Sequence, residues 1–275
     1  MSRHAKTEAL IEQARAVLSE WNPMTLRQVF YQLVSRQVLE NKESTYQGLS
    51  RKLHDARNEG AIPWEWIEDR TRIPHAVSMW NGLSDFAETA REAYRRNVWA
   101  TQPRYVECWV EKDALSGIFM DVLSPYGVTL RVARGYPSAS AIHDAAVTFG
   151  AGDGVTVLYF GDFDPTGKDI PRWIIGELAL HGSRPELVVC ALTRDDIERY
   201  HLPPNPTKAT DSRAAAFVAK HGDISVELDA LPVNVLQDRI RTETEKRMDL
   251  QALSRIHAAE EDDRRELVTA LSRIA

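Results

Sequence analysis

The sequence predicts an α/β fold in two parts, a helical front half followed by a back half built on a parallel sheet. Amphipathic helical patterns fill most of residues 5–59. From residue 105 onward, short and nearly continuous apolar runs alternate with helical patterns, which is typical of α/β proteins. A length of 275 residues is enough for about two domains. We expect them at 1–100 and 101–275, with the boundary near "ATQPRY".

Charge is distributed unevenly between the two parts. Residues 1–105 carry 15 Lys and Arg against 13 Asp and Glu, whereas the remaining residues carry 19 against 27. The net charge of −6 argues weakly against a nucleic-acid partner, but an Arg-rich front half fits a protein that touches phosphates there. The sequence has no apolar run of about 18 residues and no apolar signal core at its N-terminus. We therefore expect a cytoplasmic protein with no membrane partner.

The first helices can be assigned from the spacing of their apolar residues. A first amphipathic segment covers residues 5–20. Thr25 and Gln28 have the spacing of a capping box, which predicts that a second helix starts there. Apolar residues then recur at i, i+3, i+4, i+7 and i+8 and form one face of this helix. They are Leu26, Val29, Phe30, Leu33 and Val34.

A third helix is expected from about residue 44 to residue 59, where Gly60 ends the pattern. Its outer face is basic and carries Arg51, His54 and Arg57. Two helices with a short connection, the second one basic outside, outline a helix-turn-helix or winged-helix DNA-binding module. A small helical bundle with a solvated charged face has the same pattern and remains an alternative.

The stretch between the two halves is harder to interpret. Residues 61–103 are rich in aromatic residues and proline and would form either a wing or a crossover. Within them, residues 82–97 have a helical pattern.

The back half predicts four strands in a parallel sheet that is covered on both faces. The strands are expected at 105–110, 128–133, 155–160 and 187–192, and the helices between them at about 114–123, 138–148 and 168–180. In such sheets the chemistry lies at the carboxyl ends of the strands. The tail from about 233 to 274 is mostly helical and charged, and we interpret it as a solvent-facing or oligomer-forming element.

The third of these strands runs into "GDFDPTGKD", which places Asp162 and Asp164 at its carboxyl end. A phosphate-binding P-loop is excluded. In a P-loop, four residues separate the two glycines and Ser or Thr follows the lysine. Here five residues separate Gly161 from Gly167, and Asp169 follows Lys168. An Asp-x-Asp-x-Thr after an apolar strand is also similar to the haloacid-dehalogenase phosphatases. In that family, however, the motif usually follows the first strand of the domain, which makes this alternative weaker.

A metal site is the third interpretation of these aspartates. Glu111 and Lys112 directly follow the first strand of the back half in "WVEKDA". Because the carboxyl ends of parallel strands meet at one edge of a sheet, Glu111, Asp162 and Asp164 are expected to converge. Three carboxylates with few other ligands suit Mg²⁺, with Mn²⁺ as a substitute. A surface charge pair is the alternative for Glu111 and Lys112.

Together, these motifs resemble the A subunit of topoisomerase VI and its meiotic double-strand-break relatives. A Glu after the first strand and "DFDPTG" after the third are similar to the acidic motifs of the family's Toprim domain. "RGYPS" at 134–138, "CALTRDDIERYHLP" and "VELDAL" at 226–231 resemble further segments of the family. In the front half, "LRQVFYQL" resembles its Arg-Asp-x-Phe/Tyr-Tyr motif, except that Gln28 stands where the family usually has an acid. The short chain is most similar to the stand-alone Mini-A homologues of bacteria and mobile elements.

The resemblance implies a fold and a site. It implies an N-terminal winged-helix (CAP-like) domain, a Toprim domain and a helical C-terminal tail. Tyr31 would be the nucleophile that cleaves DNA, Arg27 would pair with the scissile phosphate, and Lys112 would add charge or serve as an acid. Helical geometry supports this independently, since Arg27 and Tyr31 lie side by side at i, i+4, just off the apolar face. A partly buried structural tyrosine is the alternative.

The implied activity is Mg²⁺-dependent cleavage of double-stranded DNA that leaves a 5′-phosphotyrosyl link. The implied partners are DNA, a second copy of the chain whose metal site serves the tyrosine of the first, and a separate ATPase subunit of the B type. Arg51, His54 and Arg57 would grip the DNA backbone. Such a protein would be nucleoid-associated. A DNA-binding or bridging protein that does not cut, and a Toprim nuclease that uses metal-bound water, remain alternatives.

Overall fold

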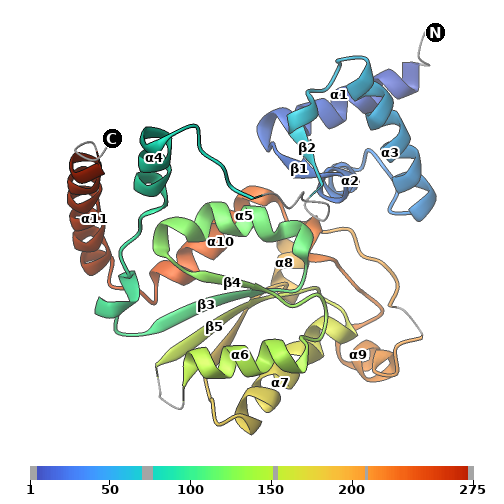
Figure 1. Ribbon diagram of the computed structural model, residues 1–275. Helices are drawn as coiled ribbons and strands as arrows, with labels where there is room; N and C mark the ends of the chain where they lie inside the picture. Colours follow the sequence, from blue (N-terminus) through green and yellow to red (C-terminus); the bar gives the residue numbers. More distant parts are fainter. Residues whose placement is uncertain (1–4, 70–76, 151–153, 208–209, 272–275) are drawn as a thin grey trace.

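The computed structural model of the protein describes residues 5–69, 77–150, 154–207 and 210–271. Its front half is helical, as expected (Figure 1). The elements are α1 (Ala5–Glu20), β1 (Met24–Thr25), α2 (Leu26–Ser35), α3 (Glu43–Asn58), η1 (Trp64–Trp66) and β2 (Ile67–Glu68). The first and third predicted helices are confirmed to within a residue at either end, and the predicted start of the second is confirmed.

Helix α2 begins at the capping box that the sequence predicts. The Thr25 hydroxyl accepts a hydrogen bond from the backbone N–H of Gln28, and the Gln28 side chain accepts one from the backbone N–H of Thr25 at 2.6 Å. Two backbone N–H groups at the start of the helix, those of Thr25 and Gln28, thereby gain a hydrogen-bond acceptor. The predicted apolar face of α2 lies in the core, together with buried residues of α1 and α3.

The stretch that was expected to be a wing or a crossover contains no antiparallel hairpin among its described residues. Instead, the two-residue strands β1 and β2 pair in parallel, with Met24 opposite Ile67. Residues 70–76 of this stretch lie outside the described residues. Helix α4 (Leu83–Ala93) confirms the helix expected at 82–97, although it ends earlier.

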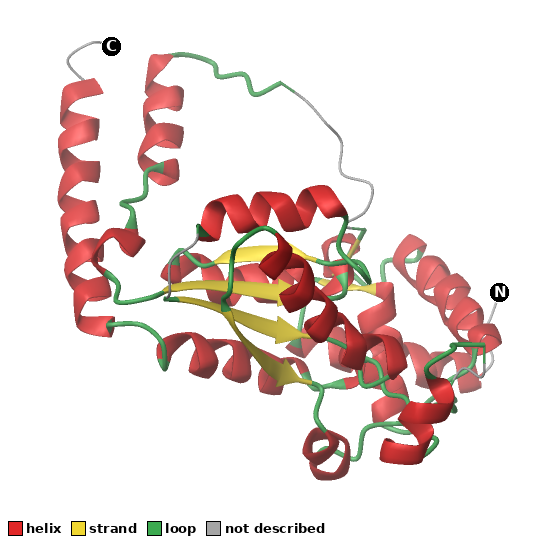
Figure 2. Cartoon of the chain, turned by 90° about the horizontal axis from the view of Figure 1, so that it is seen from below, coloured by secondary structure: helices red, strands yellow, loops and turns green. Residues whose placement is uncertain are grey.

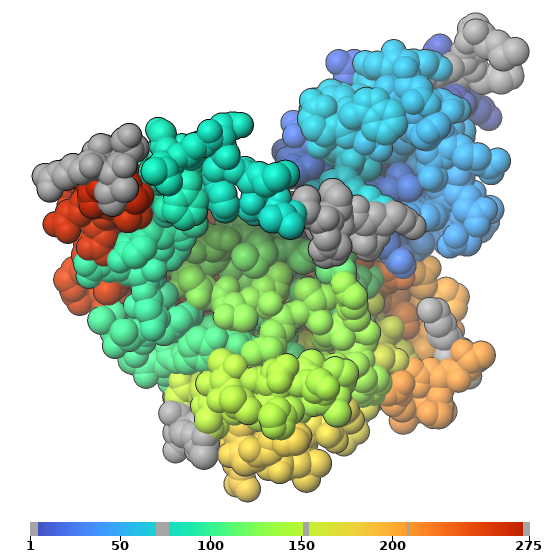
Figure 3. Space-filling view, in the orientation of Figure 1, coloured from blue at the N-terminus to red at the C-terminus, as the bar shows by residue number. Residues whose placement is uncertain are grey.

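Helix α4 packs against the C-terminal helix α11 (Leu250–Leu271), and the two lie side by side in Figures 1 and 3. The backbone N–H of Arg96, just after α4, donates a hydrogen bond to Glu260 of α11 at 2.7 Å, and the Tyr94 hydroxyl donates one to Asp263 at 2.6 Å. The turn η2 (Val98–Thr101) then leads into the sheet. The segment before the sheet is thus tied to the end of the chain.

The back half contains a parallel sheet of β3 (Tyr105–Val110), β4 (Thr129–Val132), β5 (Val155–Phe160) and β6 (Glu186–Ala191) in the order β4-β3-β5-β6. The four predicted strands and their parallel pairing are therefore confirmed. Helices α5 (Ser116–Leu123) and α10 (Val233–Glu245) cover one face, and α6 (Ala139–Phe149) and α7 (Pro165–Leu180) cover the other (Figures 1 and 2). The shorter elements are η3 (Asp113–Leu115), η4 (Ser124–Tyr126), α8 (Arg194–Arg199), α9 (Ala214–His221) and η5 (Leu228–Ala230).

Burial on both faces explains the continuous apolar runs of the strands. On β3, Val106, Cys108 and Val110 belong to the core beneath α5 and α10, whereas Trp109 belongs to the core with α6 and α7. Successive side chains of a strand point to opposite faces, so both sets of positions are mostly apolar here. The exception on β3 is Glu107, which is buried and paired with Arg131 at 2.7 Å.

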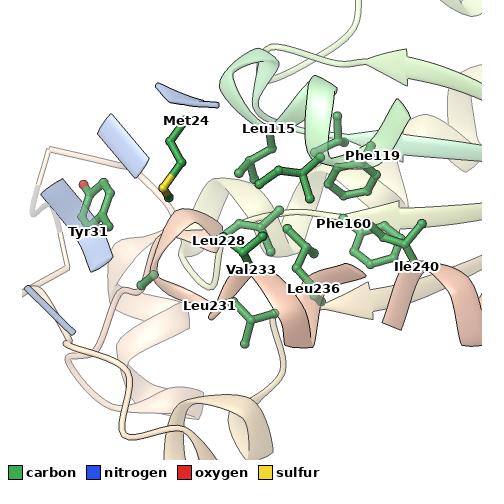
Figure 4. Close-up of a cluster of buried hydrophobic side chains, with 14 of the residues drawn as sticks. Met24, Tyr31, Leu115, Phe119, Phe160, Leu228, Leu231, Val233, Leu236 and Ile240 are labelled. Atoms are coloured by element: carbon green, nitrogen blue, oxygen red, sulfur yellow. The ribbon is translucent and has the colours of Figure 1, made fainter. Parts of the chain in front are cut away.

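The strand order creates one topological switch point, between β3 and β5. The chain leaves β3 toward β4 on one side and leaves β5 toward β6 on the other. In open parallel sheets, the crevice outside the carboxyl ends of two such strands is the usual place for a ligand. The front half docks beside this crevice, where α2 packs on η5. Figure 4 shows Met24 of the front half pointing toward Leu228, with Tyr31 at the edge of the same cluster.

Candidate functional site

Glu111 follows β3 at the switch point. Its backbone N–H donates to the carbonyl of Phe160 at 2.9 Å and so extends the β3–β5 pairing by one residue. Its Oε2 accepts a hydrogen bond from the backbone N–H of Asp162 at 3.0 Å and lies 3.5 Å from the hydroxyl of Tyr159. Burial raises the pKa of Glu111, and the negative charge of Asp164 raises it further. The predicted convergence of Glu111 with the Asp162 strand end is therefore observed.

Asp162 and Asp164 are held by the backbone on either side of them. Oδ1 of Asp162 accepts a hydrogen bond from the backbone N–H of Leu228 at 2.7 Å. Asp164 is the N-cap of α7, and its Oδ1 accepts from the backbone N–H of Gly167 at 2.6 Å. Burial raises the pKa of Asp162 above its usual range, although the nearby Lys112 ammonium opposes this.

Gly167 is required by the close approach of α7 to the acidic loop. A Cβ atom at this position would lie 2.3 Å from the carbonyl oxygen of Asp162, which is far inside van der Waals contact. The glycine of "DFDPTG" is thus explained by packing around the aspartates. It lets the start of α7 come against the strand end that carries Asp162.

The three carboxylates suit a hard cation by their chemistry. One oxygen of each is held by a backbone N–H, and within the described residues the other oxygen accepts no hydrogen bond: Oε1 of Glu111, Oδ2 of Asp162 and Oδ2 of Asp164. Such oxygens are the ligands that Mg²⁺ prefers. In the described parts of the chain, however, no three Asp, Glu, His or Cys side chains already have the geometry of a metal site. By their chemistry the donors fit Mg²⁺.

Lys112 lies among three carboxylates, two of which, Glu227 and Asp229, the sequence did not single out as site residues. Its Nζ lies 2.5 Å from Oε2 of Glu227, 2.6 Å from Oδ2 of Asp229 and 3.3 Å from Oδ1 of Asp162. Burial opposes the positive charge, but the carboxylates outweigh it and raise the pKa of Lys112 well above that of a free lysine. The carboxylates thus favour the positively charged form of Lys112, in line with a role as a fixed positive charge.

Arg27 and Tyr31 are neighbours on α2, as the helical geometry predicts. The Arg27 guanidinium lies 5.9 Å from the centre of the Tyr31 ring and 3.2 Å from Oε2 of Glu227. Lys112 Nζ is likewise 5.9 Å from the centre of the Tyr31 ring. The front half thus brings both residues to the carboxyl end of β3, next to the acidic loop.

Tyr31 itself is more enclosed than a position just off the apolar face would suggest. It is only 6% exposed and packs edge-on against Phe30 with ring centres 5.3 Å apart. Burial and the Glu227 carboxylate raise the pKa of Tyr31 above that of a free phenol, while Arg27 lowers it. The residues around the start of α3 that line the small pocket at Tyr31, together with Glu227, enclose this side chain, and this could not be foreseen from the helix alone.

The three basic residues expected on α3 differ in their surroundings. Arg51 and His54 are exposed. Arg57 instead donates hydrogen bonds to the carbonyls of Trp64 and Ile67 and stacks on the Trp64 ring at 4.0 Å. Arg57 thereby fastens the segment that contains β2, so much of its hydrogen-bonding capacity is already used.

The acidic strand ends and Arg27 border one cleft, whose volume is about 860 Å³. Arg27, Glu111, Lys112, Asp162 and Asp164 all line it, and Tyr31 lies behind Arg27 in a separate small pocket. The cleft is also lined by charged residues that the sequence reasoning left without a role: Asp113, Arg134, Asp211, Arg213 and Glu227. The segments "RGYPS" and "VELDAL" were the available signals for Arg134 and for Glu227 with Asp229.

The sequence was also compared with known proteins. No protein-family model matches the chain, and a search of curated proteins found no relative. Among the described residues, no helix combines the length and apolar character needed to cross a membrane.

Proposed function

We propose that this protein is a DNA-binding, topoisomerase VI A-like protein that cleaves DNA through Tyr31. In this proposal the front half is a winged-helix (CAP-like) domain without a described antiparallel wing, and the back half is a Toprim domain. One observation carries it: Arg27, with Tyr31 beside it, and the three carboxylates border one cleft, so that all residues of the proposed reaction lie at one place on the chain and a second copy could complete the site. The β4-β3-β5-β6 order, which leaves Glu111 and Asp162 at the switch point, supports the same conclusion.

In the proposed reaction, the phenol oxygen of Tyr31 forms a bond to phosphorus and the bond from phosphorus to the 3′ oxygen breaks. The phenol loses its proton and the departing 3′ oxygen gains one, which leaves a 5′-phosphotyrosyl link and a free 3′-OH. Arg27 is suited to pair with the scissile phosphate because a guanidinium matches two phosphate oxygens. Lys112, fixed among carboxylates, would supply positive charge near the reacting group.

Glu111, Asp162 and Asp164 would hold Mg²⁺ or Mn²⁺ through the oxygens that no backbone amide occupies. A bound Mg²⁺ would neutralise charge on the phosphate oxygens in the transition state. Arg51 and His54, both exposed on α3, would contact the flanking DNA backbone. The proposed partners are a second copy of the chain and a separate ATPase subunit.

The burial of Tyr31 favours a second candidate, a DNA-binding protein that does not form the covalent link. A tyrosine with 6% exposure and a raised pKa has to be uncovered before it can attack a phosphate. In this second case the fold and the acidic loop serve binding, or cleavage by metal-bound water.

One experiment separates these candidates. Supercoiled plasmid is incubated with the protein and Mg²⁺ or Mn²⁺, stopped with SDS, and analysed with and without protease. The proposed function predicts nicked or linear DNA that carries protein, and the loss of this product in Tyr31→Phe and Asp162→Ala. Cleavage that survives in Tyr31→Phe would replace the covalent mechanism by a nuclease. A DNA shift without any cleavage would favour the binding protein.

A further inference from the structure

The acidic cleft needs a way to accept a polyanion. Ten charged residues line it, four of them basic and six acidic. A DNA phosphate near this loop is repelled by carboxylates unless cations stand at the entrance. Lys112 is 17% exposed and is held among three carboxylates, which leaves it little freedom to reach outward. Arg27, on the α2 side, is half-exposed and bound to Glu227.

Arg134 also lines the cleft, in the "RGYPS" segment that follows β4. Its side chain is 72% exposed and makes one ion pair, from Nη2 to Oδ2 of Asp113 at 2.7 Å. A guanidinium has five N–H donors, so most of its hydrogen-bonding capacity stays available within the described structure. Its planar fork matches the oxygens of a phosphate.

The backbone of Arg134 is held in an unusual conformation. Its φ is +52°, in the left-handed region that residues other than glycine rarely adopt, and Gly135 follows at +86°. The backbone N–H of Arg134 donates to the carbonyl of Glu111 at 2.9 Å, which ties this turn directly to the acidic loop. Conformations of this kind are retained where the surrounding structure enforces them, and they concentrate at functional sites.

A polar clamp holds the rest of the segment. The Tyr136 hydroxyl donates to Asp169 of α7 at 2.6 Å and accepts a hydrogen bond from Arg213. Arg213 is itself anchored by a two-pronged contact with Asp211, at 2.9 and 3.1 Å, and by Thr166 at 3.1 Å. The pKa of Asp211 is accordingly lowered to about 2, first by its hydrogen bonds to Arg213. The turn that carries Arg134 is thus fixed at both ends.

We propose that Arg134 binds a phosphate of the DNA backbone at the cleft, beside the acidic loop, with Tyr136 and Arg213 as the residues that position it. This inference rests on the proposed function, since it names the contact by which the acidic cleft would receive DNA. It gives the "RGYPS" segment a role in binding.

The test measures binding of a fluorescent DNA duplex by anisotropy over a series of KCl concentrations at constant Mg²⁺. Arg134→Ala should weaken binding about tenfold, the value of one charge-assisted hydrogen bond. The binding constant K falls as KCl rises, and the plot of log K against log[KCl] should become shallower by about 0.9 in this variant, the value for one phosphate contact. Arg134→Gly accepts the positive φ without strain and serves as a second variant if the alanine protein folds poorly.

Arg265→Ala is the matched control. Arg265 lies on α11, has a side chain that is 77% exposed, and pairs with one aspartate, Asp262, much as Arg134 pairs with Asp113. It should keep both the affinity and the slope of the wild type. Folded Arg134 variants with the wild-type slope would overturn the inference while leaving the proposed function intact. A wild-type protein that does not bind the duplex would overturn both.

Discussion

The Lys112 ammonium lies 2.6 Å from Oδ2 of Asp229, a residue whose side chain is completely buried. The other carboxylate oxygen of Asp229 is also buried and has no hydrogen-bond partner among the described residues. A buried carboxylate in this position depends on its cation, because an unpaired charge in the interior is very costly. Asp229 therefore links the stability of the fold to a residue of the candidate site.

Replacing Lys112 by Met should destabilise the protein strongly. The change leaves Asp229 without its cation, and breaking a buried pair from one side costs about 3–5 kcal/mol. The Lys112→Met, Asp229→Leu double variant should recover part of this loss, since the fully buried charge of Asp229 is removed, while Asp162 and Glu227 still lose their contact with Lys112. Urea denaturation followed by circular dichroism gives the free energies of unfolding. A Lys112→Met protein as stable as the wild type would contradict this account of the pair.

Gly167→Ala should damage both stability and the acidic loop. The added Cβ would meet the Asp162 carbonyl at 2.3 Å, so the start of α7 or the loop has to move, which typically costs about 1–3 kcal/mol. Gly176, later in the same helix, has open space at its Cβ position, and Gly176→Ala should raise stability by about 0.5–1 kcal/mol. Thermal unfolding of the two variants tests the comparison. Equal effects of both substitutions would argue against the close approach.

Mg²⁺ should stabilise the folded protein. A ligand that binds only the folded state adds about 2.7 kcal/mol when its concentration is 100 times its dissociation constant. The melting temperature should rise with MgCl₂ for the wild type and much less for Asp162→Asn or Asp164→Asn. Asp144→Asn, which alters an exposed aspartate on α6, should behave like the wild type. A shift that survives in both loop variants would place Mg²⁺ elsewhere on the protein.

Stability should fall in acid partly through Asp196. Burial opposes the ionisation of this carboxylate, but Arg239 at 2.7 Å and the hydrogen bonds from Thr193 outweigh burial and lower its pKa. The folded-state pKa therefore lies below the unfolded value of about 3.9. The resulting stabilisation is fully present above that value and is lost as the pH falls through the lower, folded-state pKa.

Asp196→Asn should remove this contribution, which we expect to be about 2 kcal/mol at neutral pH. Free energies of unfolding are measured from neutral pH down to pH about 3, close to the reference pKa of Asp. The variant should be less stable than the wild type at neutral pH, and the difference should shrink in acid. A difference that stays constant over this range would contradict the assigned pKa direction.

Much of the architecture follows from local sequence patterns. The helices of the front half and the four strands could be placed from apolar spacing, because each element buries one face or, for the strands, both. The capping box located the start of α2 for the same local reason. The approach of Glu111 to Asp162 also follows, because the ends of neighbouring parallel strands must meet.

The surroundings of Tyr31 could not be predicted in this way. Helical spacing put Tyr31 beside Arg27, but its burial and its approach to Glu227, nearly 200 residues later in the chain, arise only when distant segments dock, among them η5 on α2. The same docking gathers Glu227 and Asp229 around Lys112.

The sequence by itself thus determined the front-half helices, the four strands, their parallel pairing and the acidic residues at the strand ends. These features depend on periodicity and on neighbours close in the chain. Tertiary structure alone decided which charges compensate one another and how far the tyrosine is enclosed. These properties depend on contacts between distant segments, and local patterns carry no information about such contacts.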